Sequence, residues 1–316
     1  LIEVNHLSRH YGPIVAVNDI SFEVRRGEVL GFLGPNGAGK SSTMQMITGN
    51  LAPSHGSVRI RGIDLLDQPK QAKAQIGYLP EQPPVYRELT VDEYLTFCAR
   101  INRVAKADLA KAVQRAKERC GLGTMAGRLI GNLSKGYQQR VGIAQAIIHS
   151  PAVVVLDEPT VGLDPIQIRE IRRLIRELGE EHGVILSTHI LPEVQMTCDH
   201  VQIISKGQLV YNDSMANLNS RTVASSLLLG LAAQVEESAL QGLPQVTRVE
   251  QLAPQRWRLH HASGVQPAAQ IAKAIHDKGW GLSELTPETK TLEQIFVEIT
   301  SAEEITATAE PAEDAA

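Results

Sequence analysis

Short runs of apolar residues alternate with stretches of helical periodicity along most of the chain. Residues 1–7 and 20–25 place apolar side chains at nearly every second position, which is typical of half-buried strands. Three longer apolar runs predict strands that are buried on both faces: VLGFLG at 29–34, VVVLDE at 153–158 and GVILSTH at 183–189. Because strands that alternate with helices form largely parallel sheets covered by helices, we expect an α/β fold.

A different pattern occupies residues 81–145, which we interpret as a mostly helical subdomain. Thr90 and Glu93 have the spacing of a capping box, a common start of a helix. The charged run AKADLAKAVQRAKERCGL follows and is stopped by Gly121. Residues 50–80, in contrast, have the pattern of short strands and turns.

The pattern changes again beyond residue 218, where a second domain is expected over 218–301. The expected order is strand, helix, strand, strand, helix, strand, at 225–233, 235–243, 246–252, 256–262, 267–279 and 281–286. This is the order of a ferredoxin-like α+β fold. An amphipathic helix around Ile295 follows. The remaining acidic tail, 302–316, has no basic residue and is predicted to be disordered.

The composition is that of an ordinary globular protein, with 43% hydrophobic and 21% charged residues among 316. Such a length predicts about two domains, and we place their boundary after residue 217. The net charge of −4 excludes a generally basic surface, so we expect no nucleic-acid partner. No apolar run reaches the ~18 residues that a membrane helix needs, so any membrane role would require a separate partner.

The phosphate-binding pattern G-x-x-x-x-G-K-[ST] is matched by GPNGAGKS, from Gly34 to Ser41. Its glycines let backbone N–H groups turn toward a phosphate, and the following helix adds the positive end of its dipole. Lys40 supplies a charge for the β- and γ-phosphates, and the Ser41 hydroxyl is a ligand for Mg²⁺. The alternative is an ordinary glycine-rich turn. The strand expected before the loop and the helix expected after it favour a nucleotide site.

Two acids, Asp157 and Glu158, end the second buried strand. Ligands bind at the carboxyl ends of parallel strands, so we expect Asp157 to hold Mg²⁺, directly or through water, and Glu158 to polarise an attacking water. The alternative is a surface turn with two solvated acids. The phosphate-binding loop in the same chain favours the catalytic interpretation.

Further motifs narrow the class of nucleotide-binding protein. The guanine-reading sequence NKxD is absent, which argues against a GTPase. LSKGYQQR (133–140) precedes the acidic strand by about one helix, GLDP (162–165) follows it, His189 ends the next apolar strand, and Tyr11 precedes the phosphate loop. Taken together, these motifs resemble the nucleotide-binding domain of ABC transporters over residues 1–217.

The resemblance implies a P-loop ABC ATPase domain with a mixed-sheet core and a helical subdomain at about 81–145. It also implies that two such domains close head to tail around two ATP molecules with Mg²⁺, as a homodimer of this subunit. The residues implied to bind ATP are Tyr11, Gly34, Pro35, Asn36, Gly37, Ala38, Gly39, Lys40, Ser41 and Ser42.

The same resemblance implies a role for each remaining motif residue. The residues implied to be catalytic are Lys40, Glu158 and His189. The implied metal ligands are Ser41, Asp157 and Glu81. The residues implied to meet the ATP of the opposite protomer are Ser134, Lys135 and Gly136, while Asp164 would connect the two sites.

Three of these residues have simpler alternatives. Tyr11 would stack on adenine, as an aromatic face allows, but a core aromatic is the alternative. Ser134 would contact the γ-phosphate, but a helix cap is the alternative. His189 would hold the γ-phosphate and the attacking water, but a histidine satisfied at a strand end is the alternative. The joint order of the motifs favours the functional interpretations.

The sequence departs from the family pattern at two places. The usual signature is LSGGQ, whereas this chain has Lys135 in place of one glycine and Tyr137 in place of the glutamine. Lys135 would add positive charge near the phosphate or face solvent. The family usually has glutamine where Glu81 stands, and an ionised carboxylate ligates Mg²⁺ but donates no hydrogen bond.

Two segments, IGYLPEQPPVYRELTVDEYL and LSKGYQQRVGIAQAI, are similar in sequence to the corresponding segments of ATPase subunits of type-two ABC exporters, of the drug-export and gliding-motility kind. We therefore expect a subunit that drives a separate integral-membrane permease from the inner face of the cell membrane. Residues 81–100, with Pro83, Pro84 and Tyr86, would receive a cytoplasmic helix of that permease. The alternative is a non-transport ABC ATPase that acts in translation or DNA repair. Such proteins generally carry paired ATPase domains, long coiled coils or zinc-binding insertions, which are not seen in this sequence.

Overall fold

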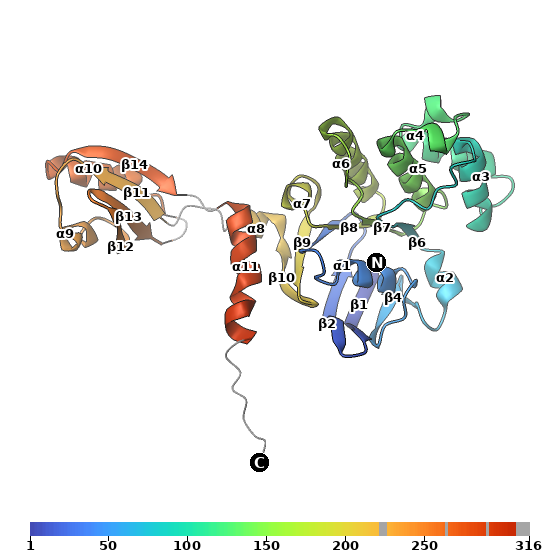
Figure 1. Cartoon of the computed structure of the whole chain (residues 1–316), viewed down its shortest axis with the longest axis horizontal. Helices are drawn as coiled ribbons and strands as arrows, with labels where there is room; N and C mark the ends of the chain where they lie inside the picture. The colour runs from blue at the N-terminus through green and yellow to red at the C-terminus, as the bar shows by residue number, and fades with distance from the viewer. Residues whose placement is uncertain (221–225, 263–264, 289–290, 308–316) are drawn as a thin grey trace, which may run out of the picture. The chain divides into compact units, whose positions relative to one another are not determined.

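The computed structural model describes residues 1–220, 226–262, 265–288 and 291–307, with backbone only for 301–307. The chain divides into two compact units, Leu1–Met215 and Ala216–Ala316 (Figure 1). Each unit has its own cluster of buried apolar side chains. Among the described residues, no helix is long and apolar enough to span a membrane.

Two sheets form the centre of the first unit. One is antiparallel, in the order β2 (Ile14–Val24), β1 (Ile2–Tyr11), β4 (His55–Ile60) and β5 (Ile63–Asp64). The other is mixed, in the order β10 (Gln208–Ser214), β9 (His200–Ser205), β3 (Val29–Leu33), β8 (Gly183–Thr188), β7 (Val153–Asp157) and β6 (Ile76–Leu79). Only β10 runs antiparallel to its neighbour in this second sheet.

Helices join these strands, and three of them form a group. The helices of the segment expected to be helical are α3 (Val91–Ile101), α4 (Leu109–Arg119) and α5 (Lys135–Ile147), with short 3-10 turns at Gly123–Met125 and Ile130–Asn132. They form a group at one end of the unit (Figure 1). The capping box at the start of α3 is confirmed, because Thr90 accepts from the Glu93 N–H and Glu93 accepts from the Thr90 N–H. The others are α1 (Lys40–Ile47), α2 (Pro69–Lys73), α6 (Pro165–Gly179) and α7 (Leu191–Thr197), while α8 (Met215–Ser220) begins at the last residue of the unit.

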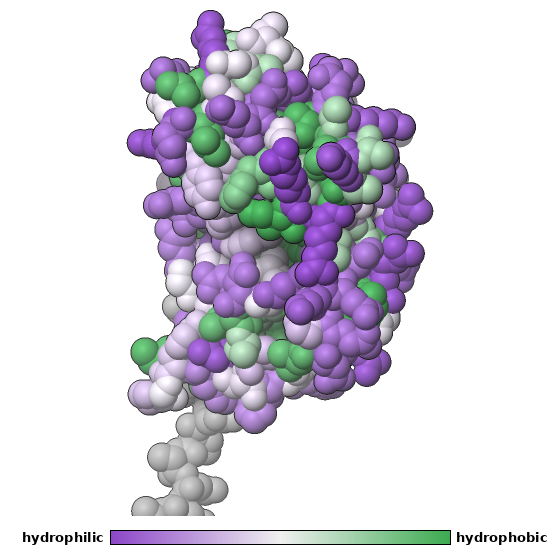
Figure 2. Space-filling view, turned by 90° about the vertical axis from the view of Figure 1, so that its right-hand side faces the viewer, coloured by the Kyte–Doolittle hydropathy of each residue, from purple (hydrophilic) through white to green (hydrophobic). Residues whose placement is uncertain are grey.

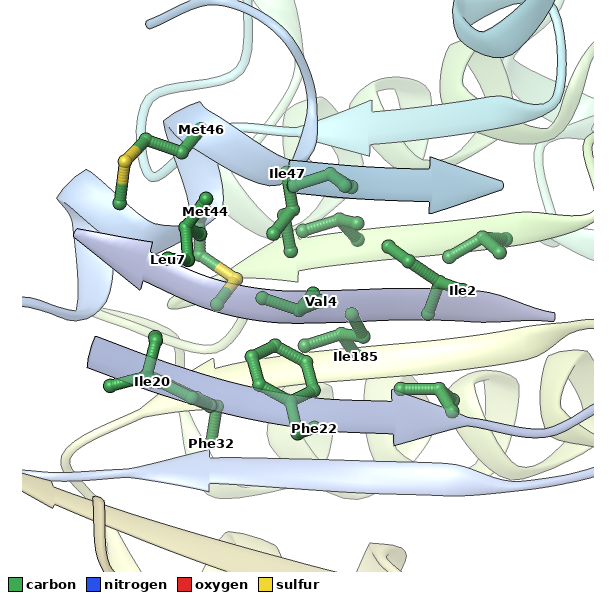
Figure 3. Packing of buried hydrophobic residues seen from close by; sticks show 14 of the residues in the cluster. Ile2, Val4, Leu7, Ile20, Phe22, Phe32, Met44, Met46, Ile47 and Ile185 are labelled. Carbon is green, nitrogen blue, oxygen red and sulfur yellow. The ribbon is translucent and has the colours of Figure 1, made fainter. Parts of the chain in front are cut away.

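A large buried cluster lies between the two sheets and includes α1. Figure 3 shows side chains of β1 and β2 directed toward α1 and the mixed sheet. The labelled residues are Ile2, Val4, Leu7, Ile20, Phe22, Phe32, Met44, Met46, Ile47 and Ile185. Both elements that flank the phosphate loop, β3 and α1, therefore contribute to this core, and burial of their side chains fixes the two ends of the loop.

The second unit is a ferredoxin-like sheet with helices on one face. Its antiparallel strands have the order β12 (Val246–Ala253), β13 (Arg256–His261), β11 (Ser226–Leu231) and β14 (Leu282–Glu288). The helices α9 (Glu237–Gln241) and α10 (Ala268–Asp277) bury apolar side chains against Trp257 and Leu259 of β13. The predicted order of strands and helices is confirmed.

Several elements differ from the sequence-based expectation. The strands β1 and β2 form a longer hairpin than predicted, turning through Gly12 at φ 58°. The last helix, α11 (Leu292–Ala307), continues into the segment expected to be disordered. Alanine and glutamate favour helix even where no apolar face requires it, and they are frequent in this segment. The rest of the expected tail, 308–316, lies outside the described residues.

Replacing Phe32 by alanine is expected to destabilise the first unit. The ring is fully buried and packs against Phe22, with centroids 5.8 Å apart. The expected loss in the free energy of unfolding is about 3–5 kcal/mol. Urea denaturation followed by far-ultraviolet circular dichroism measures it, because both tryptophans, Trp257 and Trp280, belong to the other unit.

The control for this substitution is Ile14→Ala, since Ile14 is 65% exposed. It should change the free energy by less than about 0.5 kcal/mol. A loss no larger for Phe32→Ala than for Ile14→Ala would contradict the packing described above.

Candidate functional site

A cavity of about 370 Å³ lies where the phosphate loop meets the carboxyl ends of β7 and β8. Open parallel sheets bind ligands at this edge. The lining residues are Ala16, Asn36, Gly37, Gly39, Lys40, Ser41, Ser42, Glu81, Glu158, Val161 and His189. We call this cavity the phosphate pocket. It brings together residues that are far apart in the sequence, including most of the loop.

The phosphate loop has a backbone that only glycine tolerates at Gly39. This residue has φ 108°, and a Cβ there would lie 2.5 Å from the carbonyl oxygen of Ala16. Gly39 is also the N-cap of α1, and no side chain caps the helix. The first N–H groups of α1 therefore lack an intrahelical partner and face the pocket, as anion sites at helix starts require.

Lys40 is buried at the base of the pocket, with 6% of the residue exposed. Its Nζ donates to the carbonyl oxygens of Gly34 (2.8 Å) and Pro35 (3.1 Å) and lies 3.8 Å from Oε1 of Glu158. Burial lowers the pKa of Lys40, while the carboxylates of Glu158 and Asp157 act in the opposite direction. The ammonium is thus held by its own loop and faces the space where phosphates would lie.

Glu158 follows the last residue of β7 in a left-handed conformation, with φ 48°. Such a conformation costs a non-glycine residue about 1–2 kcal/mol. The backbone N–H of Glu158 donates to the carbonyl oxygen of Ser187 (2.9 Å), which fixes the turn. The side chain carboxylate is thereby directed to the pocket rather than along the strand.

His189 follows β8 and contacts Glu158 directly. Its Nδ1–H donates to Oε1 of Glu158 at 2.9 Å, and 41% of its side chain is exposed. This contact leaves Nε2 as an acceptor when the ring is neutral and as a second donor when the ring is protonated. The histidine is therefore paired with the acid predicted to be catalytic, rather than with a purely structural partner.

A buried acid that sequence reasoning missed supports this pair. Glu193, on α7, is 1% exposed and accepts hydrogen bonds from the hydroxyls of Thr160 and Thr188. The Thr188 hydroxyl also lies 3.4 Å from Oε2 of Glu158. Glu193 thus connects the segments that carry Glu158 and His189. The only signal in the sequence is one acid inside the apolar segment ILPEV, a pattern too common to be diagnostic.

Asp157 has an unused oxygen that fits a metal ligand. The residue is 3% exposed, and its Oδ1 has no hydrogen-bond partner among the described residues. Burial raises the pKa of Asp157, and the carboxylates of Glu158 and Glu81 act in the same direction. A cation would relieve all three acids, so the residues present fit Mg²⁺.

No set of three or more histidine, cysteine or acidic side chains encloses a metal site in the described parts of the chain. This agrees with Mg²⁺, which is usually held by one or two protein oxygens, water and the phosphates of the substrate. Ser41 and Glu81 line the phosphate pocket, while Asp157 lies buried at the end of β7. These oxygens suit a hard cation of this kind.

The other residues predicted to bind ATP have different positions. Gly34 and Pro35 hold Lys40 through their carbonyl oxygens, and Ala38 is buried beneath the loop. Tyr11 does not line the pocket. It is 43% exposed at the end of β1, so it is not a core aromatic, and the guanidinium of Arg9 lies 4.6 Å from its ring centroid.

The signature residues and Asp164 lie outside the phosphate pocket of their own chain. Ser134 caps α5 by accepting from the Tyr137 N–H (3.5 Å), and Asp164 caps α6 by accepting from the N–H groups of Ile166 and Gln167 (both 3.0 Å). Gly136 packs closely against the side-chain amide of Gln167, which would have to move if position 136 carried a side chain. The structure does not bring these residues to Lys40, so they belong to a second, separate surface.

Comparison with known proteins agrees with these motifs. A family model described as "ABC transporter" matches residues 17–161. The chain is 30% identical over 302 residues to the uncharacterised ABC transporter ATP-binding protein YxlF of Bacillus subtilis, which covers 96% of this chain and all of the relative. It is 38% identical over 223 residues to the bacitracin transport ATP-binding protein BcrA of Bacillus licheniformis, which covers 70% of this chain and 72% of the relative.

A solved structure supports the same assignment. The structure of an ATP-binding subunit of an ABC transporter matches 69% of this chain and 92% of its own length, with a TM-score of 0.63 and 32% identity. The match in fold accompanies the phosphate loop, the acidic strand end and the Glu158–His189 pair described above. The chain therefore belongs to the family of ABC transporter ATP-binding proteins, which bind and hydrolyse ATP.

Proposed function

We propose that two copies of this chain close head to tail around two Mg–ATP and drive a separate membrane permease that exports its cargo. The observation that carries this proposal is the division of the motifs between two surfaces. Lys40, Glu158 and His189 meet at the phosphate pocket, whereas Ser134 lies outside it. A single chain therefore holds two half-sites, and a second copy would complete each.

In the proposed reaction, Lys40 moves from the carbonyl oxygens of its loop to the β- and γ-phosphates. The free N–H groups at the start of α1 receive the phosphate oxygens. Glu158 orients and polarises the attacking water, and His189 holds Glu158 in place and contacts the γ-phosphate. Mg²⁺, held by Ser41 and Asp157 with Glu81 nearby, would neutralise charge on the phosphates.

The second surface would act on the ATP of the opposite protomer. Ser134 is the N-cap of α5, whose first N–H groups, like those of α1, lack intrahelical partners. Presented to a γ-phosphate, this helix start would add N–H donors and the positive end of the helix dipole. Tyr11, exposed at the edge of β1, would stack on adenine after Arg9 moves from its ring.

An exposed aromatic cluster supports a permease partner. Tyr86 is 47% exposed and packs against Tyr94 and Phe97, with ring centroids 5.8 and 5.5 Å apart. Phe97 and Ile101, on α3, are 38% and 62% exposed. On the face that carries α2 and α3, apolar side chains surround a hollow (Figure 2). We infer that a cytoplasmic helix of the permease packs here, at the inner face of the membrane.

Relatives favour export over the alternative of a non-transport ATPase. BcrA is named for bacitracin transport. A second relative is the linearmycin resistance protein LnrL of Bacillus subtilis, 29% identical over 95% of this chain and 98% of its own. Such names fit removal of toxic compounds from the cell, and we extend this cargo class to the present chain only as part of the proposal.

Replacing Glu158 by glutamine is expected to retain ATP binding and to slow hydrolysis by at least about 100-fold, since a positioned base contributes 10²–10⁴-fold. The amide keeps the shape of the side chain but polarises water poorly. The variant should accumulate as an ATP-bound dimer, measured by size-exclusion chromatography with light scattering. An unchanged hydrolysis rate would refute the role of Glu158.

Replacing Lys40 by alanine is expected to weaken ATP binding at least about tenfold, since a lost charge-assisted contact costs about 1.5–3 kcal/mol. Equilibrium binding of a fluorescent ATP analogue measures the change. Lys106→Ala, which removes an exposed lysine from the turn between α3 and α4, is the control and should bind like the original chain. Equal affinities for both variants would contradict the placement of phosphate at Lys40.

Replacing Phe97 by aspartate is expected to reduce co-purification with the permease at least about tenfold, because a charge would replace a buried interface aromatic. The isolated chain should keep its ATPase rate within about twofold, since Phe97 does not line the phosphate pocket. Leu252→Asp, at a residue 44% exposed in the second unit, is the control. Retained co-purification of Phe97→Asp would argue against this docking surface.

A further inference from the structure

The two oxygens of the Glu158 carboxylate have different surroundings. Oε1 accepts from Nδ1–H of His189 at 2.9 Å and lies 3.8 Å from Nζ of Lys40. Oε2 instead has the hydroxyl of Thr188 beside it, 3.4 Å away. Because Oε1 already holds the histidine, Oε2 is the oxygen left to accept a hydrogen bond from an attacking water.

The Thr188 hydroxyl has one proton and two carboxylates near it. Its Oγ1 lies 2.8 Å from Oε2 of Glu193 but 3.4 Å from Oε2 of Glu158. Only the shorter distance is that of a normal O–H···O hydrogen bond, so the proton is donated to Glu193. The backbone N–H of Ile190 donates to the same Oγ1 at 3.1 Å, which holds the hydroxyl oxygen in place.

The carboxylate of Glu193 is fixed as an acceptor. Its Oε1 accepts from the Thr160 hydroxyl, and Nη2 of Arg172 lies 4.0 Å from the same oxygen. Its Oε2 is thereby left to Thr188. Since Glu193 and Thr188 are both buried, bulk water offers neither of them another partner. The direction of the Thr188 proton therefore depends on Glu193.

Without this acceptor, the Thr188 proton would turn to Glu158. A buried hydroxyl that lacks an acceptor costs free energy, and rotation about the Cβ–Oγ1 bond would bring its proton to Oε2 of Glu158. There it would compete with the attacking water for that oxygen. It would also stabilise the negative charge that a general base must give up as it takes a proton.

We propose that Glu193 is a positioning residue for ATP hydrolysis: by accepting the single proton of Thr188, it keeps Oε2 of Glu158 open to the attacking water. This inference rests on the proposed role of Glu158. It gives a function to a buried acid that lies next to the catalytic pair but does not line the phosphate pocket.

A double-mutant cycle in the full chain tests the inference. Glu193→Met removes both acceptor oxygens and nearly preserves side-chain length, while Thr188→Val removes the proton that would be redirected. Steady-state hydrolysis of Mg–ATP gives kcat and KM. Glu193→Met should lower kcat about tenfold beside Thr188 but less than about twofold in the Thr188→Val background, a coupling within the range for residues in contact. KM should change less than about threefold, because the lost interaction serves the reaction rather than binding.

Thr160→Val is the matched control. The Thr160 hydroxyl also donates to Glu193, but no hydrogen bond of the described residues joins it to Glu158. In the Thr160→Val background, Glu193→Met should therefore still lower kcat about tenfold. A packing role for Glu193 would make the two threonine backgrounds behave alike.

Glu193→Gln provides a second test that disturbs the buried site less. Its amide has one acceptor oxygen for two hydroxyls, so kcat should fall about threefold beside Thr188 and recover in the Thr188→Val background. Thermal unfolding followed by circular dichroism verifies that each variant is folded. Equal losses with and without the Thr188 hydroxyl, or equal recovery in the Thr160→Val background, would overturn the inference. Unchanged hydrolysis by Glu158→Gln would instead refute the proposed role of Glu158.

Discussion

The ammonium of Lys40 is buried beside acids at the carboxyl ends of the parallel strands of the mixed sheet, and the loop and its flanking elements hold it there. Two carbonyl oxygens of its own loop hold it, and Glu158 lies 3.8 Å away. Burial disfavours the charged form, so the arrangement is costly without a ligand. The apolar core compensates, because β3 and α1, on either side of the loop, are both buried in it.

Acidic side chains outnumber basic ones around Lys40 at this edge of the sheet. Asp157, Glu158 and Glu81 all act on Lys40, so side-chain charge alone does not attract a phosphate. Positive potential must come from elsewhere: the uncapped start of α1, a divalent cation at the unused Oδ1 of Asp157, and groups of a second copy. The start of α1 belongs to the same chain, so under the proposal the cation and a second copy would supply the rest of the positive charge.

Local chemistry explains which features the sequence predicts. The glycines of the phosphate loop determine its backbone conformation, and the buried strands are recognisable as apolar runs. The positions of Lys40 and Glu158 therefore follow from the sequence. The order of elements in the second unit likewise predicts its sheet. Glu193 does not follow, since only tertiary packing brings it to Thr160 and Thr188. The strands β9 and β10 and the full length of the first hairpin also depend on partners distant in sequence, which no local pattern specifies.

The alternatives that the sequence left open for the signature residues do not exclude each other. Ser134 caps α5 with the oxygen of its hydroxyl, as an acceptor, and the hydroxyl proton remains available to a phosphate. Capping also places this hydroxyl at the N-terminus of α5, beside the N–H groups of Lys135 and Gly136, which have no partner within the helix. Under the proposal, this structural role would also produce the binding geometry. The start of α5 lies outside the phosphate pocket of its own chain, so it would meet the nucleotide that a second copy holds.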